Sequence, residues 1–306
     1  MVKSSALAVT LVAALACAPA EREPVADAAP LEIANVGFAT PESMLHDPAG
    51  DVYLVSNING APSDQDDNGF ISRIGPDGAV LMLKWIDGAT EPVTLHAPKG
   101  MAIKGDTLFL ADIDVVRLFD RPTGTALGQR AVPGATFLND VAIGPDGTVY
   151  VTDTGIRITA EGMQETGTDA VYRLTADGAT AVAQGTDLGH PNGIAVDSAG
   201  IVVVSFGSGA VYRIDPVTGA RTDLPAPPQG GLDGVVALSD GSLLVSSWTG
   251  SRVYRLAAGS ATTMGDSVPS PADIGWDAGR ARVLIPVFTE NKVLIRPVQV
   301  VGDSGR

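Results

Sequence analysis

The sequence contains little of several residue types and motifs, and each shortage excludes a class of protein. Cys17 is the only cysteine among the 306 residues, so no disulfide can form within the chain. Lys and Arg number 20 against 35 Asp and Glu, and the formal net charge of −15 argues against nucleic acid as a partner. No Gly-x-Ser-x-Gly motif is present, so the sequence does not indicate a serine hydrolase of the nucleophile-elbow type.

The N-terminal segment has the form of an export signal. Lys3 precedes an apolar run over residues 6–16, which is too short to span a bilayer, and no later stretch is long enough. Residues 14–17 (ALAC) resemble a bacterial lipobox, in which the cysteine becomes the lipidated first residue of the mature protein. The sequence therefore predicts a lipoprotein signal peptide over residues 1–16, cleaved before Cys17, with an ordinary signal peptide as the alternative. The Pro, Ala and Glu content of residues 17–30 predicts a disordered tether.

These features predict where the protein resides. We expect an exported, periplasmic protein that is lipid-anchored and contacts the membrane only through Cys17. Residue 18 is Ala rather than Asp, which favours the outer membrane of a Gram-negative bacterium. The folded domain is expected to be a monomer.

The sequence is rich in glycine and proline, and a motif recurs along it. The 36 Gly and 21 Pro separate short Val, Ile and Leu runs, a composition typical of β structure with many turns. A motif of an apolar run, a turn and a second apolar run occurs six times at a period of about forty residues. Extra loops interrupt the first and third copies. The copies start at Glu42, Lys99, Asn139, Asn192, Asp233 and Ala272.

This repeat predicts an all-β fold, a six-bladed β-propeller over residues 31–300. Each blade is expected to have four antiparallel strands that bury both faces against neighbouring blades. A solenoid is the alternative, but it requires capping repeats, and none is evident. The segment at residues 31–37 (LEIANVG) is expected to pair with the C-terminal strand and close the ring.

The repeat also changes how one dipeptide is interpreted. Asn192-Gly193 is a strong hairpin-turn signal by itself, but the alignment puts the turn at residues 197–200. Asn192 then begins the innermost strand of its blade, at one mouth of the central channel, and Gly193 leaves room where the inner strands crowd. Glu42, Asn139 and Asp233 occupy the same position in other blades, so four oxygen-bearing side chains are expected to meet on the axis.

Such a ring of oxygen atoms predicts a divalent-cation site. Unpaired buried carboxylates are costly, and calcium binds carboxylate and amide oxygens. We therefore expect Ca²⁺, or another divalent cation such as Mg²⁺, Mn²⁺ or Zn²⁺; zinc and copper are less favoured because the ring has no His or Cys. The alternative is that these residues cap strand ends, as Asn and Asp often do.

The ordered set of motifs resembles the senescence-marker/gluconolactonase family, six-bladed propellers related to paraoxonases. The residues that carry the resemblance are Glu42 in PES, Asn139 in FLND, Asn192 in HPNG and Asp233 in LDG, within residues 37–298. The resemblance implies that Glu42, Asn192 and Asp233 hold an axial cation, usually calcium. It also implies that Asn139 contacts the cation or a substrate oxygen.

Two positions depart from the family. Sugar-acid lactonases tend to carry an Arg where this chain has Phe137, which argues against a polar sugar substrate. Paraoxonases carry a His where this chain has Lys99, so their His-centred mechanism does not transfer directly. Lys99 is instead a candidate for holding a substrate carboxylate, or is salt-bridged within the channel.

A few other side chains are expected near the same mouth. Asp153 and Trp248 end second strands, and His190 lies two residues before Asn192, so all three are candidate substrate contacts; capping a strand end is the alternative for Asp153. The loop from Asp64 to Gly69 resembles half of a calcium loop but lacks its bidentate Glu. It is interpreted as a flexible acidic loop, with a second ion left open.

Two functions follow from this site. The first is metal-dependent hydrolysis of a small lactone or ester, with Asp233 as general base and Asn139 orienting the substrate. The second is a non-catalytic propeller that binds partners and uses the cation as a structural pin.

Overall fold

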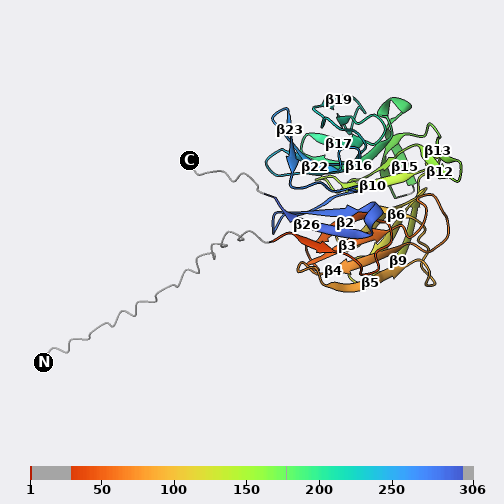
Figure 1. Cartoon of the computed structure of the whole chain (residues 1–306). Coiled ribbons are helices and arrows are strands. Elements are labelled where there is room, and N and C mark those ends of the chain that lie inside the picture. The colour runs from red at the N-terminus through yellow and green to blue at the C-terminus, as the bar shows by residue number, and fades with distance from the viewer. Residues whose placement is uncertain (2–28, 177, 299–306) are drawn as a thin grey trace.

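The computed structural model describes residue 1, residues 29–176 and residues 178–298. All but the first residue of the predicted signal peptide, the lipidation site at Cys17 and most of the predicted tether therefore lie outside the described residues and stay predictions. The described part of the chain folds into six four-stranded antiparallel sheets arranged around an axis, so the predicted six-bladed propeller is confirmed (Figure 1).

The first three blades are built in chain order from the innermost strand outwards. Blade 1 contains β2 (Pro41–Asp47), β3 (Val52–Asn57), β4 (Phe70–Ile74) and β5 (Val80–Asp87). Blade 2 contains β6 (Pro98–Lys104), β7 (Thr107–Asp112), β8 (Val115–Asp120) and β9 (Ala126–Ala131). Blade 3 contains β10 (Leu138–Ile143), β11 (Val149–Asp153), β14 (Ala170–Thr175) and β15 (Gly178–Gln184).

The other three blades follow the same plan. Blade 4 contains β16 (Pro191–Asp197), β17 (Gly200–Ser205), β18 (Val211–Ile214) and β19 (Arg221–Leu224). Blade 5 contains β20 (Leu232–Ala237), β21 (Leu243–Ser247), β22 (Arg252–Ala257) and β23 (Ser260–Met264). Blade 6 contains β24 (Gly275–Asp277), β25 (Arg282–Val287), β26 (Lys292–Pro297) and, as its outer strand, β1 (Leu31–Ile33). Two short 3₁₀ helices, η1 (Thr186–Leu188) and η2 (Phe288–Glu290), lie between strands.

The predicted closure of the ring is present. β1 pairs antiparallel with β26, and Leu31 lies opposite Ile295. The first described strand therefore completes the last blade by covering the edge of β26. In Figure 1, β26 runs beside the red N-terminal strand on the left of the propeller.

The core lies between blades rather than within one sheet. Each of six apolar clusters combines side chains of two neighbouring blades. The cluster between blades 1 and 2, for example, joins Leu54 and Ile71 to Leu110 and Phe119, all of them buried. Both faces of each sheet are covered in this way, which explains the continuous rather than alternating Val, Ile and Leu runs.

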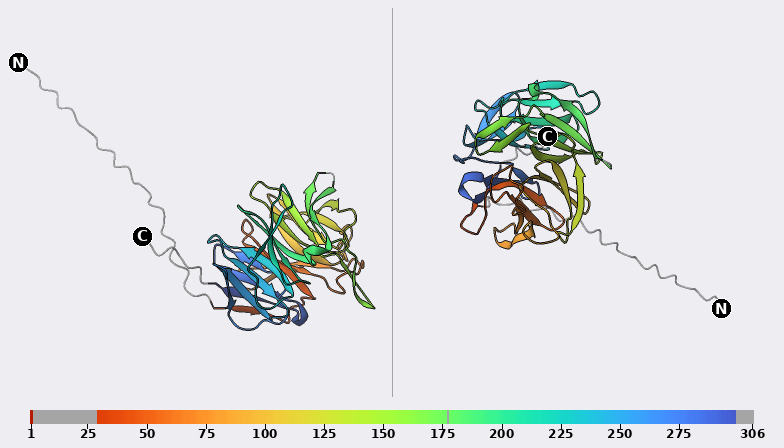
Figure 2. Two further views of the ribbon diagram at one scale, coloured as in Figure 1. Left: turned by 90° about the horizontal axis from the view of Figure 1, so that it is seen from above. Right: turned by 90° about the vertical axis from the view of Figure 1, so that its right-hand side faces the viewer.

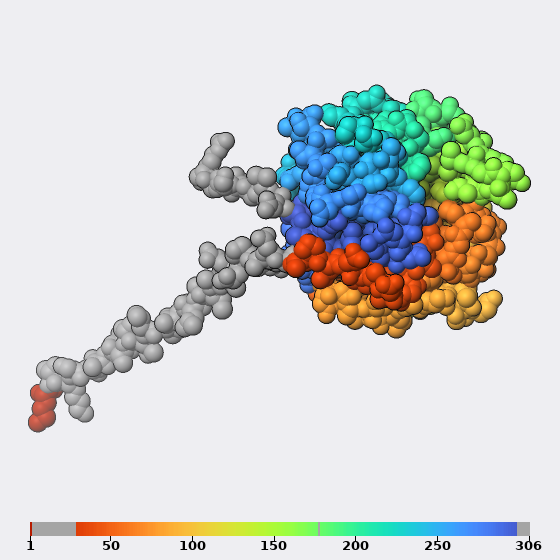
Figure 3. Space-filling model, in the orientation of Figure 1, coloured from red at the N-terminus to blue at the C-terminus, as the bar shows by residue number. Residues whose placement is uncertain are grey.

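The two interrupted copies of the repeat give two insertions that meet. The insertion in blade 1 is the loop over residues 58–69, and the insertion in blade 3 contains a hairpin of β12 (Ile156–Thr159) and β13 (Gly162–Glu165). The amide of Ile158 in this hairpin donates a hydrogen bond to Ser63 Oγ in the blade 1 loop at 3.1 Å. The hairpin lies at the right-hand edge in Figure 1, and Figures 2 and 3 show it projecting from the body of the propeller.

Candidate functional site

A β-bulge that recurs near the start of the inner strands positions the side chains of the predicted ring. In blade 3, Leu138 pairs with Asp153, but the next pair joins Val141 to Val151, so Asn139 and Asp140 form a bulge. The same register shift follows the first residue of the inner strand in blades 1, 2, 4 and 5. A bulge bends the strand and redirects its side chains. The ring residues are thus aimed at the axis by a feature of the backbone that five blades share.

Hydroxyl groups on the second strands hold these bulges in place. Thr152 Oγ1 accepts a hydrogen bond from the amide of Asp140 and donates one to the carbonyl oxygen of Asn192 in the next blade at 2.5 Å. Ser246 does the same in blade 5, accepting from the amide of Gly234 and donating to the carbonyl of Ala272. Each hydroxyl therefore connects the bulge of its own blade to the ring residue of the following one.

The structure brings four of the predicted ring side chains to the floor of one cavity. They line a cavity of about 120 Å³ and are 3 to 5% exposed. These four are Glu42, Asn139, Asn192 and Asp233. One oxygen of each is buried, and no donor in the described part of the chain reaches it: Glu42 Oε2, Asn139 Oδ1, Asn192 Oδ1 and Asp233 Oδ1.

The electrostatic state of the two ring carboxyls follows from this burial. Burial raises the pKa of Glu42 well above its ordinary value, and the charges of Asp233 and Asp273 add to the effect, while Lys99 opposes it. Burial also raises the pKa of Asp233, with the charge of Asp273 as the next cause. Neither group forms an ion pair in the described part of the chain, and Lys99 offsets the burial of Glu42 only in part, so a cation between the two carboxyls would stabilise their charged forms.

The donor set fits a hard divalent cation. Two carboxylates and two amide oxygens are ligands that calcium and magnesium accept, and an unpartnered buried oxygen costs about 1 to 3 kcal/mol. Within the described residues, no group of three or more His, Cys, Asp and Glu side chains is placed to hold a metal ion, so a site here depends on the two amides. That composition favours calcium or magnesium over zinc or copper.

A second layer of side chains, which was not predicted from the sequence, lies one residue further along each inner strand. Asp140 accepts hydrogen bonds from the amides of Val141 and of Ile194 in the next blade, at 2.7 and 2.8 Å. Asp273 accepts a hydrogen bond from Ser43 Oγ at 2.5 Å, which links blade 6 to blade 1. Burial raises the pKa of Asp273 to about 7. Reading each copy of the repeat one residue beyond the ring position would have found both carboxyls.

Glycine fills three other positions of this second layer because the strands approach closely there. A Cβ on Gly193 would lie 2.3 Å from the carbonyl oxygen of Asp233, and one on Gly234 would lie 2.3 Å from the amide nitrogen of Ile274. Gly100 faces Asp140 in the same way. The predicted role of Gly193 is thus confirmed. The turn of its hairpin lies between Asp197 and Gly200, which pair with each other.

Lys99 lines the cavity, but its ammonium group is engaged by the protein. Nζ donates to the carbonyl oxygens of Pro62 and Ala97, both at 3.0 Å, and lies 4.4 Å from the centre of the Phe137 ring. Burial lowers the pKa of Lys99 to about 8, and the charge of Glu42 opposes that shift. Lys99 thereby holds the blade 1 loop over the site through Pro62.

The other three predicted contacts occupy different places. Trp248 lies in the cavity wall, in a row of rings with Phe206 and Phe288. The carboxylate of Asp153 lies outside the wall, where it accepts hydrogen bonds from the amides of residues 136, 137 and 155, so it caps the loop that leads into β10. His190 also lies outside the wall, with Nδ1 2.9 Å from the carbonyl oxygen of Thr154.

The acidic loop over Asp64–Gly69 lies near the mouth of the cavity. Asp66 Oδ2 accepts a hydrogen bond from Asn68 Nδ2 at 2.6 Å, and the amide of Asp67 donates to His96 Nδ1. The neighbouring residues Pro62 and Ser63 contact Lys99 and the β12–β13 hairpin. Pro62 and Ser63 thus form a roof over the site, and the acidic residues that follow them lie outside the cavity lining.

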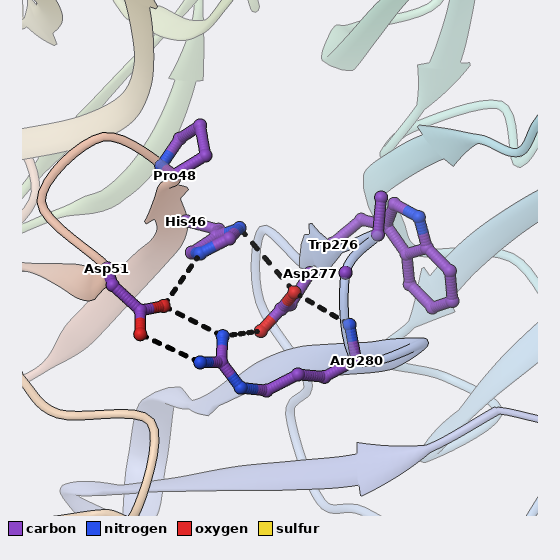
Figure 4. Close-up of a pocket in the computed structure, with 8 residues that line it drawn as sticks. His46, Pro48, Asp51, Trp276, Asp277 and Arg280 are labelled. Carbon is purple, nitrogen blue, oxygen red and sulfur yellow. Dashed lines mark hydrogen bonds and ion pairs between the residues drawn. The ribbon is translucent and has the colours of Figure 1, made fainter. Parts of the chain in front are cut away.

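A larger cavity of about 640 Å³ lies between blades 1 and 6, near the opposite end of β2 from Glu42. Arg280 donates to both carboxylate oxygens of Asp51 at 2.8 Å and to Asp277 at 3.0 Å, and His46 lies between the two carboxylates (Figure 4). These side chains pair with one another across the junction of the two blades. We therefore interpret the network as one that holds the first and last blades of the ring together.

Comparisons with known proteins agree with this architecture. A family model described as SMP-30/Gluconolactonase/LRE-like region matches residues 76–275. A search of curated proteins found no match.

Within the described residues no helix has the length and apolar character needed to cross a membrane.

Two solved structures show the same fold at low sequence identity. A gluconolactonase from Xanthomonas campestris is 18% identical with a TM-score of 0.65, over 86% of this chain and 87% of its own. Virginiamycin B lyase from Staphylococcus aureus is 15% identical with a TM-score of 0.60, over 89% of this chain and 99% of its own. Proteins named for different activities share this fold, so the activity of this chain depends on its axial site.

Proposed function

The chain belongs to the SMP-30/gluconolactonase/LRE-like family, and we propose that its axial site is the active site of a divalent-cation-dependent lactone or ester hydrolase. One observation carries the proposal. Four buried oxygen atoms from four blades lack protein partners at the floor of a cavity. A purely structural arrangement of Asn, Asp and Glu would satisfy these atoms with backbone donors, as it does at Asp153.

We infer that Glu42, Asn139, Asn192 and Asp233 hold the cation. Calcium is the ion that this donor set suits best. When bound, the cation supplies electrophilic stabilisation for the negative charge that develops on the carbonyl oxygen of a lactone or ester. Its charge also offsets the cost of keeping Glu42 and Asp233 ionised in a buried place.

The protein's own groups carry the remaining steps of this proposal. A carboxylate oxygen of Asp233 accepts a proton from the attacking water, because this buried group lies at the floor of the cavity where the carbonyl would be held. The amide of Asn139 orients the substrate oxygen at the floor of the cavity. The roof of residues 58–69 and the β12–β13 hairpin limits access of bulk water to the reacting carbonyl.

A non-catalytic propeller is the second candidate. It would use the cation only to fasten the inner strands, and the buried ring is consistent with that role. The cavity above the ring favours catalysis, since a structural ion needs no space for a further ligand.

Hydrolysis of a panel of lactones and aryl esters tests the proposal. We expect turnover in calcium-containing buffer, loss of turnover after chelation, and recovery when calcium is restored. Turnover that persists unchanged in the Asp233→Ala variant contradicts the assignment of the site. Absence of turnover on the whole panel, together with calcium-dependent thermal stabilisation, supports the structural role instead.

A further inference from the structure

The cavity walls above the ring are almost entirely apolar. One position repeats in every blade, directly after the end of the second strand. These six residues are Ile58, Ile113, Thr154, Phe206, Trp248 and Phe288. All except Ile113 line the cavity, and Ile113 packs beside Ile58. The fold therefore places a second, apolar ring above the ring of oxygen atoms.

The two insertions extend this apolar wall. Ile156, Ile158 and Met163 of the β12–β13 hairpin face the cavity, and Pro62 of the blade 1 loop joins them. The hydrogen bond from Ile158 to Ser63 holds the two insertions together. Aliphatic groups of blades 1 and 3 thus face the aromatic row of blades 4, 5 and 6 across the cavity.

Polar groups that could recognise substrate hydroxyls are scarce in this wall, where the buried indole N–H of Trp248 is the donor left without a partner among the described residues. The ammonium of Lys99 already donates to two carbonyl oxygens and contacts the ring of Phe137. The side-chain hydroxyl of Thr154 donates to the carbonyl of Pro191 at 2.9 Å. A polyhydroxylated substrate would bury hydroxyl groups without partners here, and enzymes reject ligands strongly on that ground.

The volume limits what fits next to the ring. About 120 Å³ is close to the roughly 150 Å³ of an apolar cavity that admits benzene. One five- or six-membered ring fills that space, and any side chain has to extend along the apolar walls toward the mouth. Met163, which is 59% exposed, stands where such a side chain would leave the cavity.

We propose that the site takes lipophilic lactones or esters, with an alkyl or aryl substituent lying between the hairpin and the aromatic row, and discriminates against sugar lactones. This inference rests on the proposed hydrolase function for its chemistry. It concerns the substrate class alone, so binding of unreactive analogues can test it separately.

The kinetic test compares three δ-lactones: unsubstituted, butyl-substituted and glucono-δ-lactone. We expect kcat/KM to rise about fourfold for each methylene buried, which corresponds to about 0.8 kcal/mol. Glucono-δ-lactone is expected to fall at least tenfold below the unsubstituted ring. The Met163→Gln variant and the Ile158→Gln/Met163→Gln double variant should lower the ratio of kcat/KM for the butyl lactone to kcat/KM for the unsubstituted lactone at least threefold.

Met82→Gln is the matched control, because Met82 is 52% exposed on the outer strand β5, outside the cavity wall. It should leave all three substrates unchanged. Melting temperatures of the variants within about 2 °C of the parent exclude general unfolding as the cause.

Binding of the corresponding δ-lactams, which resist hydrolysis, separates the two proposals. Tighter binding of the butyl lactam, weakened by Met163→Gln, supports the inference even when no lactone is hydrolysed. Hydrolysis that favours glucono-δ-lactone, or is indifferent to the butyl group, overturns it while leaving the hydrolase function standing. A protein that neither hydrolyses the lactones nor binds the lactams overturns both.

Discussion

Asp233 and Glu42 present carboxylates that burial makes costly to ionise, and the surrounding protein offers little compensation. Burial is the largest cause of the raised pKa of each group, and the neighbouring Asp273 adds to it. At the scale of single residues, the axial ring therefore contains two buried carboxylates whose charge is poorly compensated. A bound cation would compensate that charge, and the affinity for the cation should depend on each of the two carboxylates.

Replacing one ring carboxylate by its amide tests this directly. We expect Asp233→Asn to weaken calcium binding at least tenfold, which is about 1.4 kcal/mol, as measured by isothermal titration calorimetry. The chelated variant should be at least as stable as the chelated parent, because the uncompensated buried charge has gone. Asp114→Asn, at an exposed turn, is the control and should leave the affinity unchanged. Equal affinity in Asp233→Asn and the parent contradicts the assigned site.

The positions of some site side chains could be predicted from the sequence, whereas the roles of others could not. Glu42, Asn139, Asn192 and Asp233 were found because the repeat places them at one offset, and the fold turns a shared offset into a shared location. The roles of Asp153 and Lys99 depend on partners elsewhere. Asp153 caps backbone amides sixteen and seventeen residues upstream, and Lys99 donates to Pro62, thirty-seven residues away. No local sequence pattern predicts contacts between residues so far apart in the chain.

At the scale of elements, the inner strands crowd together around the axis. Their bulges and second-layer glycines allow five strands to approach the ring without collision. The strands and turns were predictable from the repeat. The bulges were not, because the register shift arises from pairing with the second strand and leaves no signature of its own in composition.

Gly193 gives a prediction for this packing. A Cβ there would lie 2.3 Å from the carbonyl oxygen of Asp233 and 2.8 Å from the Cα of Gly234, so backbone has to move. We expect Gly193→Ala to cost about 1 to 3 kcal/mol, or roughly 2 to 4 °C in melting temperature per kcal/mol. Gly230→Ala is the matched control, since its Cβ would meet only the Cα of Gly209 at 3.5 Å. Equal melting temperatures for the two variants contradict the crowding argument.

At the scale of the whole molecule, the buried carboxyls connect stability to pH. An unfolded Asp ionises near pH 4, whereas burial raises the pKa of Asp273 to about 7. Between these values the folded protein binds more protons than the unfolded chain, so the free energy of unfolding falls as pH rises from about 4 to about 7. The pKa values of Glu42, Asp140 and Asp233 are raised as well, with burial as the largest cause, and act in the same direction.

Thermal unfolding of the protein, after a chelator has removed divalent cations, should show this dependence of stability on pH. We expect the melting temperature to fall between pH 5 and pH 7.5 without a divalent cation. Excess calcium should reduce that fall, because calcium binds the ionised ring more tightly as pH rises. Asp233→Asn should show a shallower fall than the parent in the chelated state. A melting temperature that rises across this range without a cation contradicts the explanation.

Closure of the ring by β1 depends on the order in which the strands are synthesised. Leu31 leaves the ribosome long before its partner Ile295. At 5 to 20 residues per second, the delay is roughly 13 to 50 s. For that interval β1 has no strand to pair with, and the circle of ring residues is open between its first and last blades. The cation site is therefore finished only after synthesis of the chain is nearly complete.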